Sequence, residues 1–420
     1  LGLPGCQLSI ESRGWWYLMS TRRDFLHQST LLGATLASPS VFGQVGFTSL
    51  ARKVRVAIVG GRFGLSFQFH EHPDCVVEAV AELRPARLAA LQKVYKCAKG
   101  YPSLEAMLED PKVEAVFLAT PAPDHVRHTL LCLAAGKHVL SAVPAAMTLE
   151  DCGRLAAAVK QSGLTYMMAE TSCWQQLTIS ARTFHAEGRF GHLYYTESEY
   201  HHPGLETLYF ENGQRTWRHG LPPMHYPTHC TSHLLSVTGE RLTEVVCHGW
   251  GDEHPIVKDN AYHNPFWTET ALFRTDRGNS MRVAIWWRGA QKGGERARYF
   301  GDKMSFYFSD PTGTNGPSIV RAETKTEKDS GGFERSSQIL EKYAEVKWWK
   351  TDLLPEPLRH DSGHEGSHCF ITHEFVDAVA KGRKPFVGID EALAFTVPGM
   401  IAHQSAMNGG QSLKIPTITG

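Results

Sequence analysis

The chain has 420 residues, of which 42% are hydrophobic and 20% charged, a composition typical of a globular protein with room for two domains. Lysine plus arginine and aspartate plus glutamate each number 43, so the zero net charge gives no electrostatic reason to expect nucleic acid or an anionic membrane as a partner. The nine cysteines are scattered without a Cys-x-x-Cys pair, which argues against a disulfide framework or a structural zinc site.

Residues 1–50 are predicted to be a leader. Ser20-Thr-Arg-Arg-Asp-Phe-Leu-His27 precedes a short apolar run and resembles a twin-arginine export signal, which carries folded proteins to the periplasm or another extracytoplasmic space. Met19 directly precedes this block and is a candidate start of translation. The alternative is a disordered tail. Beyond the leader no apolar stretch approaches ~18 uninterrupted residues, so no membrane span is expected.

Residues 51–174 alternate between strand and helix patterns. Buried-strand runs are predicted at 54–59, 75–82, 113–120, 137–142 and 164–170. The helices between them begin at Pro85, at Asp124 and after Thr148, where Thr148-Leu-Glu-Asp151 has the form of a capping box. Strands that are spaced by helices in this way predict an α/β fold with a doubly wound parallel sheet.

A glycine-rich turn follows the first strand and consists of Gly60, Gly61, Arg62, Phe63 and Gly64. Arg62 and Leu65 stand where the Gly-x-Gly-x-x-Gly pattern requires glycine. The remaining glycines can still form a tight turn whose N–H groups approach a pyrophosphate. The alternative is a plain structural turn.

Glu82 ends the second strand 22 residues after Gly60 (82 − 60), close to the position of the acid that binds an adenosine ribose. A carboxylate there accepts hydrogen bonds from the ribose hydroxyls and repels a 2′-phosphate, which favours NAD over NADP. Arg84 is a candidate to hold such a phosphate and argues the other way. Together the turn and Glu82 predict a dinucleotide-binding Rossmann domain.

Residues 175–420 are predicted to form an α+β domain with a largely antiparallel sheet. Strands are expected at 193–202, 242–250, 269–275, 280–287 and 297–309, with a hairpin turn at 276–279. Helices are expected at 175–188, 368–381 and 390–406, and residues 310–345 read as a long surface excursion.

Two segments of the first domain resemble the Gfo/Idh/MocA dehydrogenases. Gly136-Lys-His-Val-Leu-Ser-Ala-Val-Pro-Ala-Ala-Met-Thr148 resembles the family strand that leads into Glu-Lys-Pro, and Ala119-Thr-Pro-Ala-Pro-Asp-His125 resembles the loop under the nicotinamide. The resemblance implies a tightly bound NAD that contacts Thr120, Pro121, His125 and Pro144, and it makes a homo-oligomer plausible. Val143 occupies the position of the family's proton-relaying lysine, and Ala142 that of the glutamate. The acid–base partner must therefore come from elsewhere.

The densest polar and aromatic cluster runs from Thr216 to His229. Tyr226-Pro-Thr-His229, together with Val143-Pro-Ala-Ala146, resembles the NAD-dependent α-N-acetylgalactosaminidases of this superfamily. The resemblance implies proton transfer by Tyr226 and His229, and substrate contacts from His202, Arg218 and His225. An imidazole titrates near neutrality, and a phenol acts as a base where nearby charge stabilises its phenolate. The alternative is that these side chains belong to the core or the surface.

The implied reaction is a redox-neutral hydrolysis, in which sugar oxidation at C3, elimination from C1 and C2, water addition and reduction follow one another. One rival is a simple sugar or cyclitol dehydrogenase that uses His229 in place of the lysine. The other is a non-catalytic carbohydrate-binding protein with a vestigial cofactor site. The sequence does not specify the sugar or the anomer.

His360, His364 and His368 recur at four-residue spacing. On a continuous helix they would share a face and could bind zinc. Gly363 and Gly366 interrupt that helix, so no metal is predicted.

Overall fold

The computed structural model describes residues 52–418. The predicted leader, with its twin-arginine pattern, lies outside the described residues. In the part that is described, no helix combines the length and the apolarity needed to cross a membrane.

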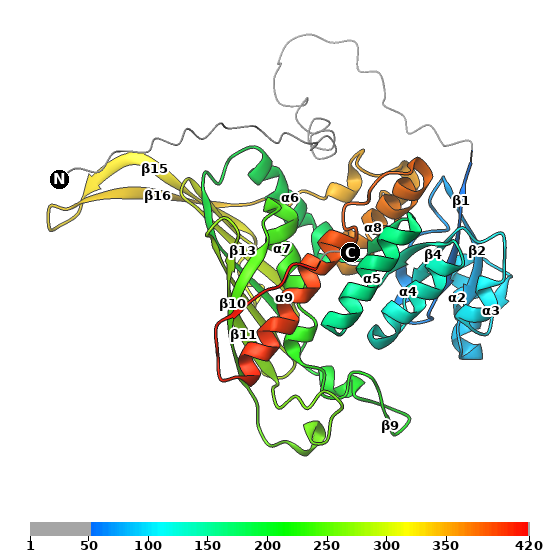
Figure 1. Ribbon diagram of the computed structural model, residues 1–420. Helices are drawn as coiled ribbons and strands as arrows, with labels where there is room; N and C mark the ends of the chain where they lie inside the picture. Colours follow the sequence, from blue (N-terminus) through cyan, green and yellow to red (C-terminus); the bar gives the residue numbers. More distant parts are fainter. Residues whose placement is uncertain (1–51, 419–420) are drawn as a thin grey trace, which may run out of the picture. The chain divides into compact units, whose positions relative to one another are not determined.

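A six-stranded sheet occupies the first part of the described chain, with strand order β3-β2-β1-β4-β5-β6 and parallel pairing throughout (Figure 1). This is the order of a doubly wound dinucleotide-binding domain, so the predicted fold of this part is confirmed. The strands are β1 (Val54–Val59), β2 (Cys75–Ala81), β3 (Gly100–Tyr101), β4 (Ala115–Leu118), β5 (His138–Ser141) and β6 (Tyr166–Met168).

The helices of this domain start and stop where the local sequence predicts. α2 has Pro85 at its first position, and the Thr148 side chain caps α5 by accepting a hydrogen bond from Asp151 N at 3.1 Å. β3 and α3 were not predicted, because two and five residues are too short to show a period. The helices are α2 (Pro85–Tyr95), α3 (Leu104–Leu108), α4 (His125–Ala134) and α5 (Leu149–Ser162).

A nine-stranded sheet forms the second part, with order β16-β15-β14-β13-β7-β12-β11-β10-β17. Only the β7–β12 pair is parallel, which confirms the α+β prediction. The strands are β7 (Leu193–His201), β10 (Leu242–Trp250), β11 (Thr268–Thr275), β12 (Ser280–Trp286), β13 (Gly294–Gly301), β14 (Met304–Tyr307), β15 (Ser318–Lys328), β16 (Glu334–Lys342) and β17 (Leu413–Lys414).

Helices α6, α7 and α9 lie along one side of this sheet (Figure 1). α8 lies between this layer and the first sheet and contacts β1. The bounds of the helices are α6 (Gln176–Ala186), α7 (Thr228–Thr238), α8 (Gly363–Lys381) and α9 (Ile389–Met407).

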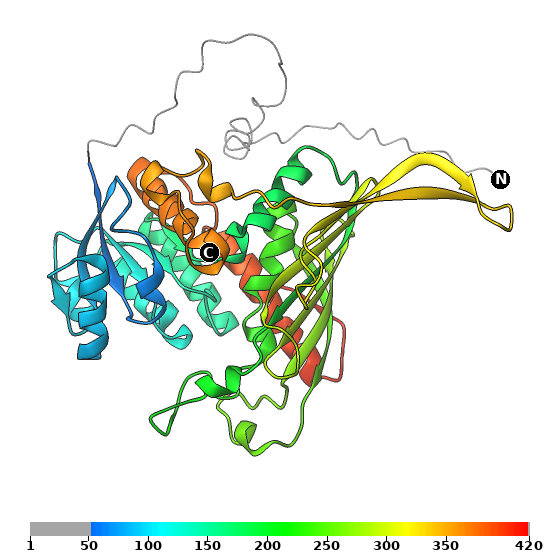
Figure 2. The same cartoon turned by 180° about the vertical axis from the view of Figure 1, so that it is seen from behind.

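Two expectations about the second sheet are wrong. The single strand expected at 297–309 is two strands, β13 and β14, because the chain reverses at Asp302 and Lys303. The surface excursion expected at 310–345 contains the hairpin β15–β16, which extends the sheet (Figures 1 and 2). Most β16 side chains are exposed, so this hairpin lacks the one-sided apolar alternation that marks a half-buried strand.

The carboxyl ends of β5 and β6 face the C-terminal part of the chain. Met168 N donates to Val387 O at 3.0 Å, and Ala145 N donates to the Thr396 hydroxyl at 3.3 Å. In doubly wound sheets ligands bind outside these strand ends, and the candidate site forms here.

Candidate active site

The glycines of this turn lie where a Cβ atom would have little or no room. Gly60 has a φ of +106°, and a Cβ atom there would lie 2.4 Å from the carbonyl oxygen of Ala119. Gly64 packs so closely that its Cβ would lie 3.2 Å from Ile58 Cγ2. Arg62 is exposed, whereas the Phe63 ring packs edge-on against Phe67 at 5.1 Å. The turn therefore keeps the close backbone packing that a dinucleotide site needs, despite its unusual sequence.

Glu82 is held beside this turn at the end of β2. Its Oε2 accepts from Gly61 N at 2.6 Å and its Oε1 accepts from Arg84 N at 3.0 Å. Each carboxylate oxygen retains further acceptor capacity. The residues fit an adenosine ribose placed against Glu82, and that contact stays a prediction.

His125 joins the loops that follow β4 and β5. Its Nδ1 lies 2.8 Å from Pro144 O and its Nε2 lies 2.9 Å from Thr120 O. Burial lowers the pKa of His125, against the opposing effect of these two carbonyls. Both ring nitrogens are engaged, so this residue holds the loop of Thr120 and Pro121 against Pro144. Its contact with a cofactor stays a prediction.

His229 lies in the first turn of α7 and meets carboxylates from both sheets. Its Nδ1 is 2.9 Å from Glu170 Oε1 and 3.8 Å from Glu295 Oε1. Glu170 follows β6 and is fully buried, whereas Glu295 belongs to β13 and accepts hydrogen bonds from Ser172 Oγ and Gln175 Nε2. The two domains therefore meet at this histidine.

These carboxylates control the charge of His229. Burial alone would lower its pKa, but Glu170 and Glu295 raise the pKa to about 9. Burial would raise the pKa of Glu170, and the charge and hydrogen bond of His229 lower it instead. The pair is ionic at neutral pH, so His229 is protonated rather than close to its midpoint. At rest it is a proton donor.

Two tyrosines pack against this imidazolium. The Tyr226 ring centroid lies 5.4 Å from that of His229, and the Tyr200 centroid lies 4.9 Å from it. Burial raises the pKa of Tyr226, and the nearby Arg218 charge opposes this. Tyr226 therefore keeps its proton at rest, because the stabilisation that Arg218 gives to its phenolate only partly offsets burial.

The three predicted substrate-contacting residues separate into two groups. Arg218 stacks on the Trp217 ring at 4.2 Å, and the His202 ring meets Tyr200 edge-on at 6.1 Å, so both border the cluster. His225 instead lies 5.0 Å from the His403 ring, and burial together with His403 lowers its pKa to about 3. His225 sits in a tight turn that directs its ring towards α9. Its predicted contact with substrate has no support from this packing.

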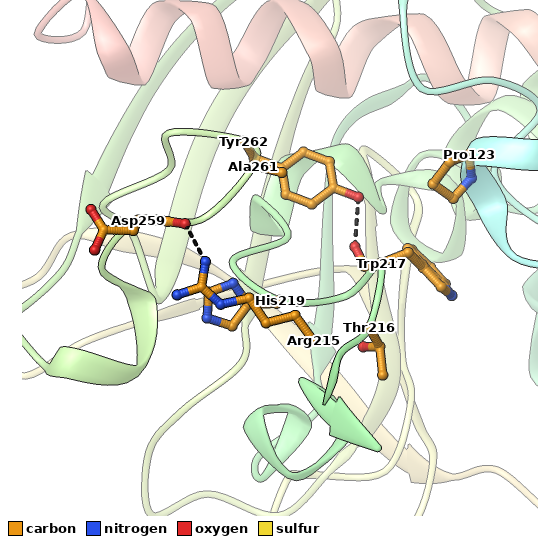
Figure 3. Close-up of a pocket in the computed structure, with 8 residues that line it drawn as sticks. All are labelled: Pro123, Arg215, Thr216, Trp217, His219, Asp259, Ala261 and Tyr262. Carbon is orange, nitrogen blue, oxygen red and sulfur yellow. Dashed lines mark hydrogen bonds between the residues drawn. The ribbon is translucent and has the colours of Figure 1, made fainter. Parts of the chain in front are cut away.

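A cavity of about 360 Å³ opens beside Trp217 and Tyr262 (Figure 3). Tyr262 Oη donates to Trp217 O at 2.7 Å across one wall, and Arg215 Nη1 donates to Asp259 O at 2.7 Å across another. This size is within the range of small-molecule sites. The lining residues are Pro123, Arg215, Thr216, Trp217, His219, Asp259, Ala261 and Tyr262.

The second histidine series does not gather into one cluster. His364 Nδ1 lies 2.9 Å from His368 Nε2, but His360 Nε2 contacts Glu71 Oε2 at 2.6 Å instead. Left-handed backbone from His364 to Gly366 breaks the helix, near the glycines that the sequence pointed to. Within residues 52–418 no group of three or more His, Cys, Asp or Glu side chains is arranged to hold a metal ion.

Two carboxylates of the candidate site were not predicted from the sequence. Glu170 could have been found, because it follows the carboxyl end of a parallel strand, where ligand sites form. Glu295 could not, because only the pairing of β13 with β7 brings it near His229.

Known proteins resemble this chain in sequence and in fold. Residues 54–170 match the model of the Gfo/Idh/MocA oxidoreductase family, NAD-binding Rossmann fold. An alpha-N-acetylgalactosaminidase of Bacteroides fragilis is 29% identical over 46% of this chain, and the match spans only 51% of that relative. A glycosyl hydrolase family 109 protein of Stenotrophomonas maltophilia is 24% identical over 95% of both chains.

A solved levoglucosan dehydrogenase in complex with NADH has the same fold, with a TM-score of 0.70, 17% identity, and coverage of 87% of this chain and 100% of that one. The family match therefore falls on the domain that carries the glycine turn and Glu82, and the fold likeness includes the second sheet. Residues 54–170 are therefore similar to the NAD-binding domain of the Gfo/Idh/MocA oxidoreductase family.

Proposed function

We propose that this protein is an NAD-containing enzyme that hydrolyses a glycoside without net oxidation. One observation carries the proposal: a buried His229 paired with the carboxylate of Glu170 lies beside Tyr226 at the carboxyl ends of the cofactor-domain strands. Val143, 5% exposed, stands where a simple dehydrogenase of this family has its lysine. The relative named as an alpha-N-acetylgalactosaminidase and the relative named as a glycosyl hydrolase family 109 protein support the same reading.

The cofactor would be held by the turn at Gly60, by Glu82 and by the loops that His125 joins. When bound, NAD supplies a hydride acceptor that becomes a hydride donor at the end of the cycle. Glu82 supports NAD over NADP, because its carboxylate would repel a 2′-phosphate.

The chain's own residues would move the protons. The hydrogen-bond partners that the described residues give His229 all contact Nδ1, so Nε2 can donate to a sugar oxygen. Tyr226 can take the acidified proton at C2 in its phenolate form, which results when the phenol proton leaves to water and which Arg218 stabilises. The aglycone leaves C1, and water then supplies OH to C1 and H to C2. The sum is glycoside plus water giving sugar plus alcohol.

Aryl α- and β-glycosides in D2O, with purified protein and no added cofactor, test this proposal. The expected result is phenol release with one deuterium at C2 of the product and no accumulation of NADH. A simple dehydrogenase would instead form NADH in proportion to free sugar or cyclitol. A non-catalytic binding protein would do neither. Mass spectrometry of the natively isolated protein measures whether NAD is retained.

Export in the folded state suits a self-regenerating cofactor, because no supply of free NAD is needed outside the cytoplasm. The Arg22-Arg23 pair supports export by the twin-arginine route. Replacement of both arginines by lysine should keep the protein in the cytoplasmic fraction. Association of copies would follow by analogy with the family, and light scattering would measure it.

A further inference from the structure

A small hairpin of the second domain carries a carboxylate into the cofactor domain. Its strands are β8 (Phe210–Glu211) and β9 (Gln214–Arg215), and the hairpin is marked by β9 in Figure 1. Glu211 Oε2 lies 2.7 Å from Arg84 Nη2, and Oε1 lies 2.6 Å from Arg87 Nη2. Hydrogen bonds from Arg84 and Arg87 lower the pKa of Glu211 to about 2, so it is ionised at neutral pH.

The two arginines stand where a ribose 2′-substituent would lie. Arg84 caps α2, and its backbone N–H donates to Glu82 Oε1 at 3.0 Å. Arg87 packs against the glycine turn, since a Cβ on Gly61 would lie 2.8 Å from Arg87 Cβ. An arginine beside the ribose acid is the usual partner of an NADP phosphate. The cofactor domain taken alone therefore holds one feature that favours NAD, the Glu82 carboxylate, and one that favours NADP, the pair of arginines.

The carboxylate from the second domain resolves this conflict. Arg84 and Arg87 bring two positive charges, and Glu82 and Glu211 bring two negative ones. Glu211 engages one terminal nitrogen of each guanidinium and, together with Glu82, balances the positive charge that a phosphate would meet. We infer that Glu211 is a specificity-determining residue. Its ion pairs with Arg84 and Arg87 keep these arginines from binding a 2′-phosphate, so the site selects NAD over NADP. This inference rests on the proposed dinucleotide site.

The test compares NAD and NADP affinities of the full chain stripped of cofactor, by titration calorimetry. In Glu211→Gln the ratio of NADP to NAD affinity should rise about tenfold, the order expected when one charge a few ångströms from a phosphate is removed. Glu211→Asp keeps the charge and should stay close to wild type. Glu334→Gln on β16 removes the same charge elsewhere and should leave the ratio unchanged.

A fourth variant tests whether the effect acts through the two arginines. Adding Arg84→Ala and Arg87→Ala to Glu211→Gln should return the ratio to the wild-type value or below. An unchanged ratio in Glu211→Gln, with normal NAD binding, would overturn the inference and reduce Glu211 to a surface ion pair that ties the hairpin down. If the wild-type protein binds neither dinucleotide, the proposed function itself fails.

Discussion

Two buried glutamate–histidine pairs lie in this molecule and have almost the same local geometry. His229 Nδ1 is 2.9 Å from Glu170 Oε1, and His403 Nδ1 is 2.8 Å from Glu269 Oε1. Both glutamate side chains are fully buried. The contact alone does not distinguish them.

The surroundings of the two pairs distinguish them. His229 has a second carboxylate, Glu295, and two tyrosine rings beside it at the edge of the cofactor-domain sheet. The other oxygen of Glu269, Oε2, instead accepts a hydrogen bond from Met224 N at 2.7 Å, which fixes the turn before α7. The first pair is built to hold a charge next to a ligand, and the second is built to hold a backbone turn. A buried Glu–His contact is therefore evidence of catalysis only with its neighbours.

Replacing each histidine by glutamine gives the sharpest contrast. Glutamine can still donate to the carboxylate but cannot transfer a proton. His229→Gln should lower kcat/KM on aryl glycosides by about 10²–10⁴-fold, whereas His403→Gln should lower the unfolding temperature and leave kcat/KM little changed. Equal losses of activity in both variants would erase the distinction.

Tyr226→Phe removes the proposed base while keeping the ring that packs on His229. An approximately 10²-fold loss of kcat is expected, together with loss of deuterium incorporation at C2. Tyr343→Phe is the matched control, because the Tyr343 hydroxyl contacts Ser180 at 2.9 Å and lies outside the cluster. Unimpaired deuterium exchange in Tyr226→Phe would remove this residue from the mechanism.

Glu170→Gln should move the pKa of His229 downwards from about 9, because the chief attraction that opposes burial is lost. The folded pKa exceeds the ordinary value of 6.5, so the pair's contribution to stability is complete below pH 6.5 and is lost as pH rises through 9. Thermal unfolding from pH 6 to 10 should show this decline in wild type and in Glu269→Gln. A decline that persists in Glu170→Gln would assign it to another group.

The smallest effect is expected at His225. Its folded pKa of about 3 lies below the ordinary 6.5, so the unfolded chain binds the extra proton and stability falls as pH drops from 6.5 towards 3. His225→Gln should flatten part of that acid decline, as measured by denaturant unfolding at pH 7 and pH 4. No change in slope would show that the His225 ring is free to charge in the folded protein.

The cofactor domain could be predicted closely because its signals are local. The run Val54–Val59, Pro85 at a helix start and the Thr148 cap are each readable within a few residues. The second domain was harder, since β16 lacks a buried face. The turn between β13 and β14 does carry a signal, the Gly301-Asp302 pair, which the single strand predicted at 297–309 overlooked. The surroundings of His225 could not be predicted, because one residue in a tight turn can face either side, and its contact with substrate stays a prediction.

By itself the sequence determined the longer strands and helices of the cofactor domain, the tight turn at Gly60, and the choice of Glu82, Tyr226 and His229 as candidate site residues. These depend on periodicity, steric demands and spacing that neighbouring residues set. Only the tertiary structure decided the charge of His229 and the state of Arg84 and Arg87. Glu170 and Glu295 lie 59 and 66 positions from His229 (229 − 170 and 295 − 229). Glu211 lies 127 positions from Arg84 and 124 from Arg87 (211 − 84 and 211 − 87). Electrostatic interactions depend on distance in space rather than on separation along the chain.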